Sequence, residues 1–173
     1  MSYRSLPYVD PGAARGPLQR STMRLLGSRV MVALERSLPF RLVAWRLTPR
    51  LLRLSGGRVA SLLPFPADVL ETRDARDGRP HRRAVVYFHD GDRVTLIPSR
   101  AGMAADPFWF QNALADPAVR FGERPYRAEA VEDPEAQARL WRLAEAAYPP
   151  NVTHRQDAAR RGRTIPILQL TPR

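Results

Sequence analysis

The first third of the chain alternates apolar and basic residues at helical spacing. Residues 1–17 hold three prolines and several small residues, so we expect a mobile or wrapping arm there. From residue 18 the apolar positions recur every three or four residues until Pro39, and a second such segment spans residues 40–54. The pattern therefore predicts helices within residues 18–54.

The rest of the chain is dominated by short runs of strand-forming residues. Asp90-Gly91 lies between two of these runs and indicates a hairpin, because hairpin turn positions need residues that tolerate positive φ. A charged loop over residues 73–83 separates the first two runs. The expected strands are residues 68–72, 84–89, 93–98, 119–121, 125–131 and 164–170.

Two Asp-Pro pairs predict helix starts. Asp106-Pro107 predicts a short helix with the acid as N-cap and the proline at the first helical position, and Asp116-Pro117 ends it. Asp133-Pro134 predicts a second helix that reaches Ala147 by the same capping logic. Hairpins imply antiparallel pairing, so the expected architecture is α+β: a small antiparallel β-barrel of about six strands, with the N-terminal helices and the inserted short helix packed outside. We expect one domain over residues 18–173.

Composition excludes several kinds of site. The chain has no cysteine, and its histidines, His81, His89 and His154, are scattered, so we expect no disulfide and no metal. The first 17 residues are too polar for a secretory signal, and no apolar run approaches the roughly 20 residues that span a bilayer. We therefore expect a cytoplasmic protein.

Arginine carries all of the basic side-chain charge, because the chain contains no lysine. Heavy use of arginine, alanine and proline is typical of a GC-rich genome such as that of an actinobacterium. The net charge of +11 is therefore weaker evidence for an anionic partner than the position of each arginine.

Familiar catalytic motifs are missing: the sequence has no serine elbow, no Walker-type Gly-Lys pair and no GxGxxG. What remains is a cluster of loop arginines that a hairpin would bring to one end of the barrel, where they could bind an anion with help from the N–H groups of Ala101 and Gly102. A solvated basic loop explains the same residues equally simply. The arginines are Arg73, Arg76, Arg79, Arg82, Arg83 and Arg100.

The stretch from Ser99 to Pro117 carries a more specific signal. Ser99-Arg100-Ala101-Gly102, a short spacer and then PFWFQNALADP resemble the hallmark of the deazaflavin-dependent nitroreductase family, split β-barrel oxidoreductases that use coenzyme F420. The hairpin YFHDGDR, the pairs Leu140-Trp141 and Tyr148-Pro149, and the closing run IPILQLTP are similar to the same family. The resemblance extends from Val69 to the C-terminus and implies a split antiparallel β-barrel.

The resemblance also implies a function. A member of this family transfers a hydride from reduced F420 to an electrophilic organic substrate: a quinone, enone, imine or nitro compound. The candidate proton donors are Tyr148 and His154. Trp109 and Asn112 share a helix face that would line the slot for the flat coenzyme ring, while Phe108 and Phe110 would pack toward the barrel or the N-terminal helix. The implied cofactor-binding residues are Thr72, Arg76, Gly78, Ser99, Arg100, Ala101, Gly102, Trp109 and Asn112.

The expected phosphate loop departs from the family pattern. Asp74, Ala75, Asp77 and His81 stand where the family has glycine, arginine, serine and arginine. Two carboxylates would repel a phosphate unless they pair with Arg73 or Arg79. The segment 150–156 also lacks the family's tyrosine, so substrate recognition should differ.

The sequence leaves alternatives open. A diverged barrel could bind a ligand or act as a scaffold without redox turnover. Nucleic-acid binding rests on charge alone, since the aromatic residues are not interleaved with arginine. Residues 18–54 could roof the substrate site or make peripheral contact with a membrane at its inner face. Homodimerisation is also open.

Overall fold

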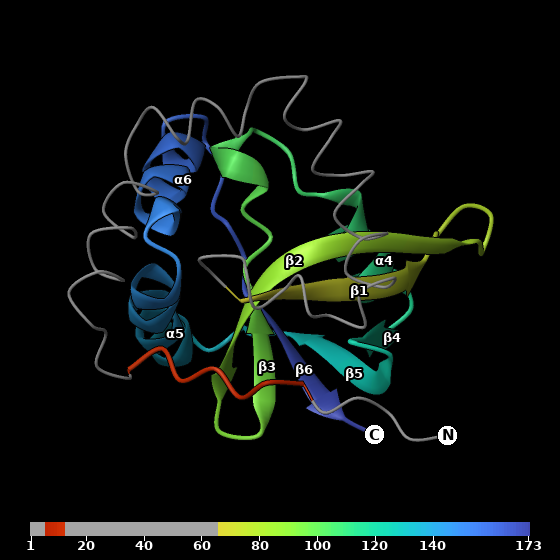
Figure 1. Cartoon of the computed structure of the whole chain (residues 1–173). Coiled ribbons are helices and arrows are strands. Elements are labelled where there is room, and N and C mark those ends of the chain that lie inside the picture. The colour runs from red at the N-terminus through yellow and green to blue at the C-terminus, as the bar shows by residue number, and fades with distance from the viewer. Residues whose placement is uncertain (1–5, 13–65) are drawn as a thin grey trace.

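Six antiparallel strands close into a barrel in the computed structural model, which describes residues 6–12 and 66–173. The ring order is β1-β2-β3-β6-β5-β4, and β1 closes it by pairing Leu70 with Phe121 of β4 (Figure 1). The small antiparallel barrel predicted from the sequence is thus confirmed. The strands are β1 (Ala67–Arg73), β2 (Pro80–Asp90), β3 (Arg93–Leu96), β4 (Ala118–Phe121), β5 (Arg124–Ala130) and β6 (Leu168–Pro172).

Helices lie on two sides of this barrel. Helices α5 (Pro134–Ala147) and α6 (Pro150–Ala159) stand together on one side, and α4 (Phe108–Ala115) lies on the other beside β1 and β5. A short 3₁₀ turn, η2 (Arg100–Gly102), packs against α6. The helices predicted within residues 18–54 lie outside the described residues, so the domain boundaries remain a prediction.

Two apolar clusters stabilise this arrangement. The first fills the barrel and includes Trp109, Phe110 and Ala113 of α4, which shows that α4 contributes to the barrel core. The second joins α5 and α6 to the barrel wall through Leu140, Trp141 and neighbouring apolar residues. The inserted helix predicted from Asp106 onward therefore belongs to the core of the fold.

Several predicted boundaries were wrong. Strand β2 begins at Pro80, because Thr72 pairs with His81 and Arg73 with Pro80, so Arg82 and Arg83 lie in a strand and not in a loop. Strand β6 begins at Leu168 and not at residue 164. Before it, Ile165 and Ile167 pack with α5 and α6. Helix α6 was not predicted, because its polar sequence PNVTHRQDAA buries few apolar side chains and shows no apolar period.

Capping chemistry separates the two Asp-Pro helix starts. Asp133 caps α5 as predicted, accepting a hydrogen bond from the Ala136 N–H at 2.7 Å. Asp106 does not cap α4: Pro107 occupies the N-cap position, and the Asp106 carboxylate accepts hydrogen bonds from Arg163 instead. The predicted hairpin is present, with Gly91 at φ +64° in the turn between β2 and β3, the left-handed region that glycine favours.

Replacing Leu70 by alanine should destabilise the fold strongly. The side chain is fully buried in the barrel cluster, and truncating a buried leucine costs about 2–5 kcal/mol of unfolding free energy. Urea unfolding measures the loss. The matched control is Leu114→Ala, an exposed leucine of α4 whose truncation should change stability by no more than about 0.5 kcal/mol. Equal losses for both variants would contradict the barrel core described above.

Residues 6–12 lie along the hairpin of β2 and β3 (Figure 1). The Val9 N–H donates to Nδ1 of His89 at 3.0 Å, and the Val9 carbonyl accepts from the His89 N–H at 2.9 Å. The Tyr8 ring stacks on the same imidazole, with 4.7 Å between ring centroids. An Nδ1 atom that accepts a hydrogen bond carries no proton, so this contact requires neutral His89.

Stability should therefore fall in mild acid. Burial lowers the pKa of His89 below its ordinary value of 6.5, so the unfolded chain binds more protons over the interval between the two values. The stabilising effect is complete above 6.5 and is lost as the pH falls through the folded pKa. Urea unfolding from about pH 8 to about pH 5 measures the slope, which His89→Gln should reduce. An unchanged slope in that variant would contradict this role. His81, whose pKa is also lowered, contributes in the same direction.

Candidate active site

A left-handed turn follows β3 and forms one half of the candidate site. Arg100, Ala101 and Gly102 have φ of +47°, +51° and +70° in succession. For residues other than glycine this conformation costs roughly 1–2 kcal/mol each. Strained backbone of this kind is typical of functional sites and persists only where surrounding contacts hold it. We call residues 99–102 the Ser99 turn.

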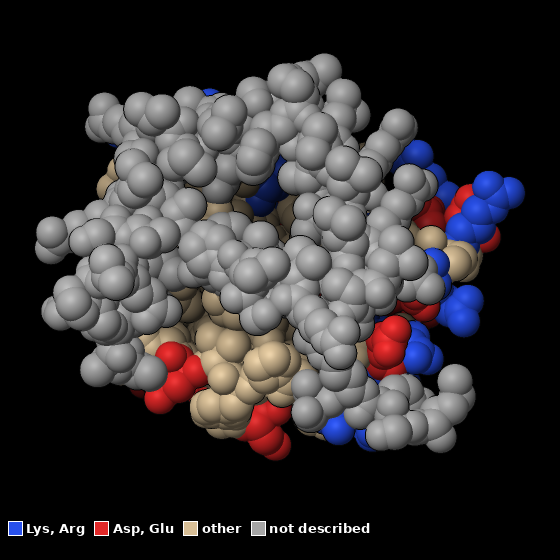
Figure 2. All heavy atoms as spheres, viewed as in Figure 1, with Lys and Arg blue, Asp and Glu red and all other residues tan. Residues whose placement is uncertain are grey.

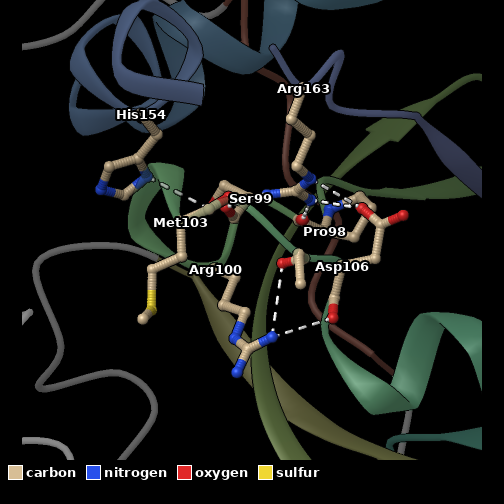
Figure 3. Close-up of polar contacts among 8 residues, drawn as sticks. Pro98, Ser99, Arg100, Met103, Asp106, His154 and Arg163 are labelled. Carbon is tan, nitrogen blue, oxygen red and sulfur yellow. Dashed lines mark hydrogen bonds and ion pairs between the residues drawn. The ribbon is translucent and has the colours of Figure 1, made fainter. Parts of the chain in front are cut away.

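One predicted proton donor, His154, lies beside this turn, and the other, Tyr148, packs against His154. Nδ1 of His154 lies 3.2 Å from Oγ of Ser99, and the imidazole is only 2% exposed (Figure 3). Tyr148, at the end of α5, packs with its ring centroid 6.2 Å from that of His154. The structure thus brings Ser99 together with two residues that follow it by 49 positions (Tyr148) and 55 positions (His154).

The Ser99 turn does not form the simple anion nest that the sequence suggested. The Gly102 N–H donates to the Ser99 carbonyl at 3.0 Å, and the Met103 N–H donates to the Arg100 carbonyl at 3.1 Å. The N–H of Gly102 is therefore engaged within the turn.

The Arg100 side chain lies over its own loop. Its Nη1 donates to the Asp106 carbonyl at 3.2 Å and, at 3.5 Å, to that of Ala105. Figure 3 shows the guanidinium directed away from His154. The predicted convergence of Arg100 with the arginines of residues 73–83 on one anion stays a prediction.

The turn between β1 and β2, residues 74–79, forms the second half of the candidate site. Asn112 of α4 holds it: the Asn112 Oδ1 accepts from the Ala75 N–H at 3.2 Å, and its Nδ2 donates to the Thr72 hydroxyl at 3.4 Å. Thr72 and Asn112 are both buried, so they position the turn. Gly78, at φ +69°, supplies the left-handed residue that the turn requires.

Most charged side chains in and beside the β1–β2 turn are paired within the protein, and the guanidinium of Arg76 is left over. Asp77 pairs with Arg79 at 3.5 Å, and the Asp74 carboxylate accepts from the Arg76 N–H at 2.9 Å. Arg73 pairs with Asp116 at 3.9 Å. Figure 2 shows acidic and basic side chains interleaved at this edge of the molecule. In the described part of the chain the Arg76 guanidinium makes no hydrogen bond or ion pair, so it is available to an anion.

His81, which replaces the family's arginine, adds an unsatisfied polar atom. Its Nδ1 is buried and makes no hydrogen bond within the described residues. Burial lowers the pKa of His81, the Arg83 charge lowers it further, and Asp74 opposes both effects. His81 is the register partner of Thr72, so this nitrogen lies close to the β1–β2 turn.

The aromatic run of α4 divides differently from the prediction. Trp109 is 6% exposed and packs edge-on against Phe110 in the barrel core, so it offers no open face for a coenzyme ring. Phe110 packs inward as expected. The prediction that Phe108 packs toward the barrel is wrong, because its side chain is 56% exposed. The other predicted partner of Phe108, the N-terminal helix, lies outside the described residues.

Sequence reasoning missed Arg163. Its side chain is 7% exposed and lies against the Ser99 turn, where its guanidinium contacts Asp106 (Figure 3). No local pattern marks this residue, because its partners lie 57–65 positions earlier in the chain. The only sequence feature that could have drawn attention to Arg163 is its position directly before Thr164-Ile165-Pro166, the start of the predicted last strand.

Two further kinds of site were searched for in residues 6–12 and 66–173. No cluster of three or more histidine or acidic side chains is placed to hold a metal ion. Over the same residues, every helix is too short or too polar to cross a bilayer.

Comparison with known proteins agrees with this geometry. Residues 44–172 match the family described as F420H(2)-dependent quinone reductase. The F420H(2)-dependent quinone reductase of Mycobacterium tuberculosis strain H37Rv is 31% identical over 148 residues, which cover 81% of this chain and 96% of the relative.

Solved structures share the fold. A structure titled F420-H2 Dependent Reductase (FDR-A) superimposes with a TM-score of 0.53 at 24% identity, covering 61% of this chain and 93% of the other. A structure described as a domain-swapped dimer matches with the same score and identity, covering 79% of that chain. The split-barrel resemblance inferred from the motifs is confirmed, and the chain belongs to the F420H(2)-dependent quinone reductase family.

Proposed function

We propose that this protein reduces a quinone, or another electrophilic acceptor such as an enone, imine or nitro compound, at the expense of reduced coenzyme F420. Family membership supports the coenzyme and the quinone. The observation that carries the proposal is the contact of Ser99 Oγ with His154 Nδ1, beside a strained turn and a cation. When bound, the coenzyme supplies a hydride, and the protein supplies orientation and protons.

The residues present fit the anionic parts of such a coenzyme, which carries a phosphate and an acidic glutamyl tail. Arg76 and Arg100 offer charge at two turns, and guanidinium groups match phosphate and carboxylate geometry. The two acidic substitutions in the β1–β2 turn are engaged locally, Asp77 with Arg79 and Asp74 with its own turn. The unsatisfied His81 Nδ1 is consistent with a ligand at this turn. Trp109 does not supply a ring-stacking face.

The Ser99–His154 pair supplies the proton. A quinone that gains a hydride becomes an anion, and one proton converts it to the hydroquinone. The Ser99 hydroxyl can donate its proton to the developing oxyanion while His154, in its doubly protonated form, donates its Nδ1 proton to Ser99 Oγ. His154 is then a neutral imidazole and takes up one proton before the next turnover. Tyr148 lies close enough to contact His154 and to orient its ring. This arrangement assigns roles to both predicted donors, with Tyr148 as support.

Fluorescence titration with oxidised coenzyme tests the proposal. We expect saturable binding in the micromolar range, followed by turnover when reduced coenzyme and a soluble naphthoquinone are supplied. The ratio of kcat/KM values for a quinone, an enone, an imine and a nitro compound then identifies the acceptor class. Failure to bind coenzyme at tens of micromolar would favour the ligand-binding or scaffold alternative.

We propose further that the protein acts in the cytoplasm and as a homodimer. The cysteine-free sequence supports the first, and the exposed apolar side chains of Phe108 and Leu114 support the second. Sedimentation velocity tests the dimer. Residues 18–54 lie outside the described residues, so their contact with a membrane stays a prediction for sedimentation with anionic liposomes.

A further inference from the structure

The guanidinium of Arg163 uses every N–H group it has. Nη1 donates to the carbonyls of Ser99 (3.0 Å) and Met103 (2.9 Å), and Nη2 donates to the Pro98 carbonyl (2.6 Å) and to Asp106 Oδ1 (2.5 Å). Nε donates to the same Asp106 oxygen at 2.9 Å. Five hydrogen bonds match the five donors of a guanidinium, so no donor is left for a ligand.

These acceptors bracket the Ser99 turn. Pro98 and Ser99 precede its left-handed residues, Met103 follows them, and Asp106 begins the approach to α4. Figure 3 shows the Arg163 side chain directed toward these residues. Arg161 adds a longer hydrogen bond, 3.4 Å from its Nη1 to the Gly102 carbonyl. The loop between α6 and β6 therefore holds a turn that lies about 60 residues earlier in the chain.

The turn needs such support. Arg100 and Ala101 have side chains and positive φ, a conformation that L-residues leave unless other contacts hold them. Two main-chain hydrogen bonds, Gly102 N–H to Ser99 O and Met103 N–H to Arg100 O, close the turn. Arg163 binds the Ser99 carbonyl that accepts the first of these bonds, and it binds the residue that donates the second.

We propose that Arg163, together with Asp106, is a positioning residue for this enzyme: it holds the Ser99 turn in its left-handed form, and so fixes the Ser99 hydroxyl against His154 and the Arg100 cation at the coenzyme. This inference rests on the proposed function. Arg163 acts through the turn, because all five of its donors bind protein acceptors. A lysine cannot replace it, because an ammonium offers three donors around a point and not a planar fork.

Amide hydrogen exchange without coenzyme tests whether Arg163 and Asp106 hold the Ser99 turn; we call these two residues the clamp. In Arg163→Lys, the Gly102 and Met103 amides should exchange at least about tenfold faster, because hydrogen bonds to a charged group are worth at least that factor. Amides of the β2–β3 hairpin should not change. The matched control is Arg160→Lys, an exposed arginine near the same loop that pairs with Asp157, which should leave the turn's exchange unaltered.

Kinetics test the link to function. Arg163→Lys should raise the coenzyme Kd and lower kcat, each by about tenfold, because both Arg100 and Ser99 lose their positions. Asp106→Asn removes the charge on the clamp's one acidic acceptor and should produce a smaller change in the same direction, which keeps the proposal testable if the lysine variant does not fold.

Unchanged exchange at Gly102 and Met103 in folded Arg163→Lys or Asp106→Asn would overturn the clamp. Faster exchange with unchanged Kd and kcat would overturn the positioning role. A wild-type protein that binds no coenzyme would instead refute the proposed function, while the exchange data would still decide whether Arg163 holds the turn.

Discussion

Ser99→Ala and His154→Phe should each lower kcat for quinone reduction by about a hundredfold, the lower range of what a positioned proton donor contributes. The pair lies 3.2 Å apart, with His154 buried beneath the turn that carries Ser99. The double variant should be little slower than either single one, since two residues that deliver one proton act as a unit. Steady-state kinetics with a soluble naphthoquinone measures all three.

The control for this set of two single variants and one double variant is Val152→Ala, an exposed residue on the same helix as His154. Its kcat should match the wild type. Coenzyme Kd and thermal stability should change little in Ser99→Ala, which separates a proton-delivery defect from a folding defect. Additive losses in the double variant would mean that Ser99 and His154 act independently, contrary to the shared role proposed here.

Arg100→Ala should weaken coenzyme binding about ten- to hundredfold while leaving kcat at saturation nearly unchanged, because a charge-assisted contact to a bound anion makes the same contribution before and during the reaction. Arg76→Ala should do the same to a smaller extent, since that side chain is exposed. Both effects should shrink as salt is added. Fluorescence titration at low and high ionic strength measures them.

Arg142→Ala is the matched control for the arginine variants. Arg142 is exposed on α5, which is not one of the two turns of the candidate site, and its removal lowers the net charge by the same amount. A drop in affinity for Arg142→Ala equal to that for Arg100→Ala would show that coenzyme affinity follows net charge. The assignment of the coenzyme site to the Ser99 turn and the β1–β2 turn would then be wrong.

Local signals predicted most of the fold, and they failed where a distant residue intervened. Asp133 and Asp106 both precede proline, yet only Asp133 caps its helix. Arg163, 57 residues away from Asp106, takes the second carboxylate, and no local pattern contains that information. Strand positions followed from runs of strand-forming residues, but the start of β2 depends on its register with β1, which adds Pro80 to Arg83 to the strand.

The candidate site was predictable to the extent that motifs carry it. The Ser99 turn, His154 and Tyr148 were identified, and the structure brings them together. The contact between Ser99 and His154 could not be predicted, because α6 was not recognised as a helix. Trp109 was assigned to the ring slot from its spacing to Asn112, but packing of the barrel core buries it.

The central claim is that this chain oxidises reduced F420 with a quinone, and anaerobic turnover tests it most directly. Purified protein, reduced coenzyme and a soluble naphthoquinone should show coenzyme oxidation at a rate proportional to the protein added. One quinone should be consumed for each coenzyme oxidised. Saturable coenzyme binding with no oxidation above the rate without protein, for any of the four acceptor classes, would contradict the account and identify a barrel that binds without turnover.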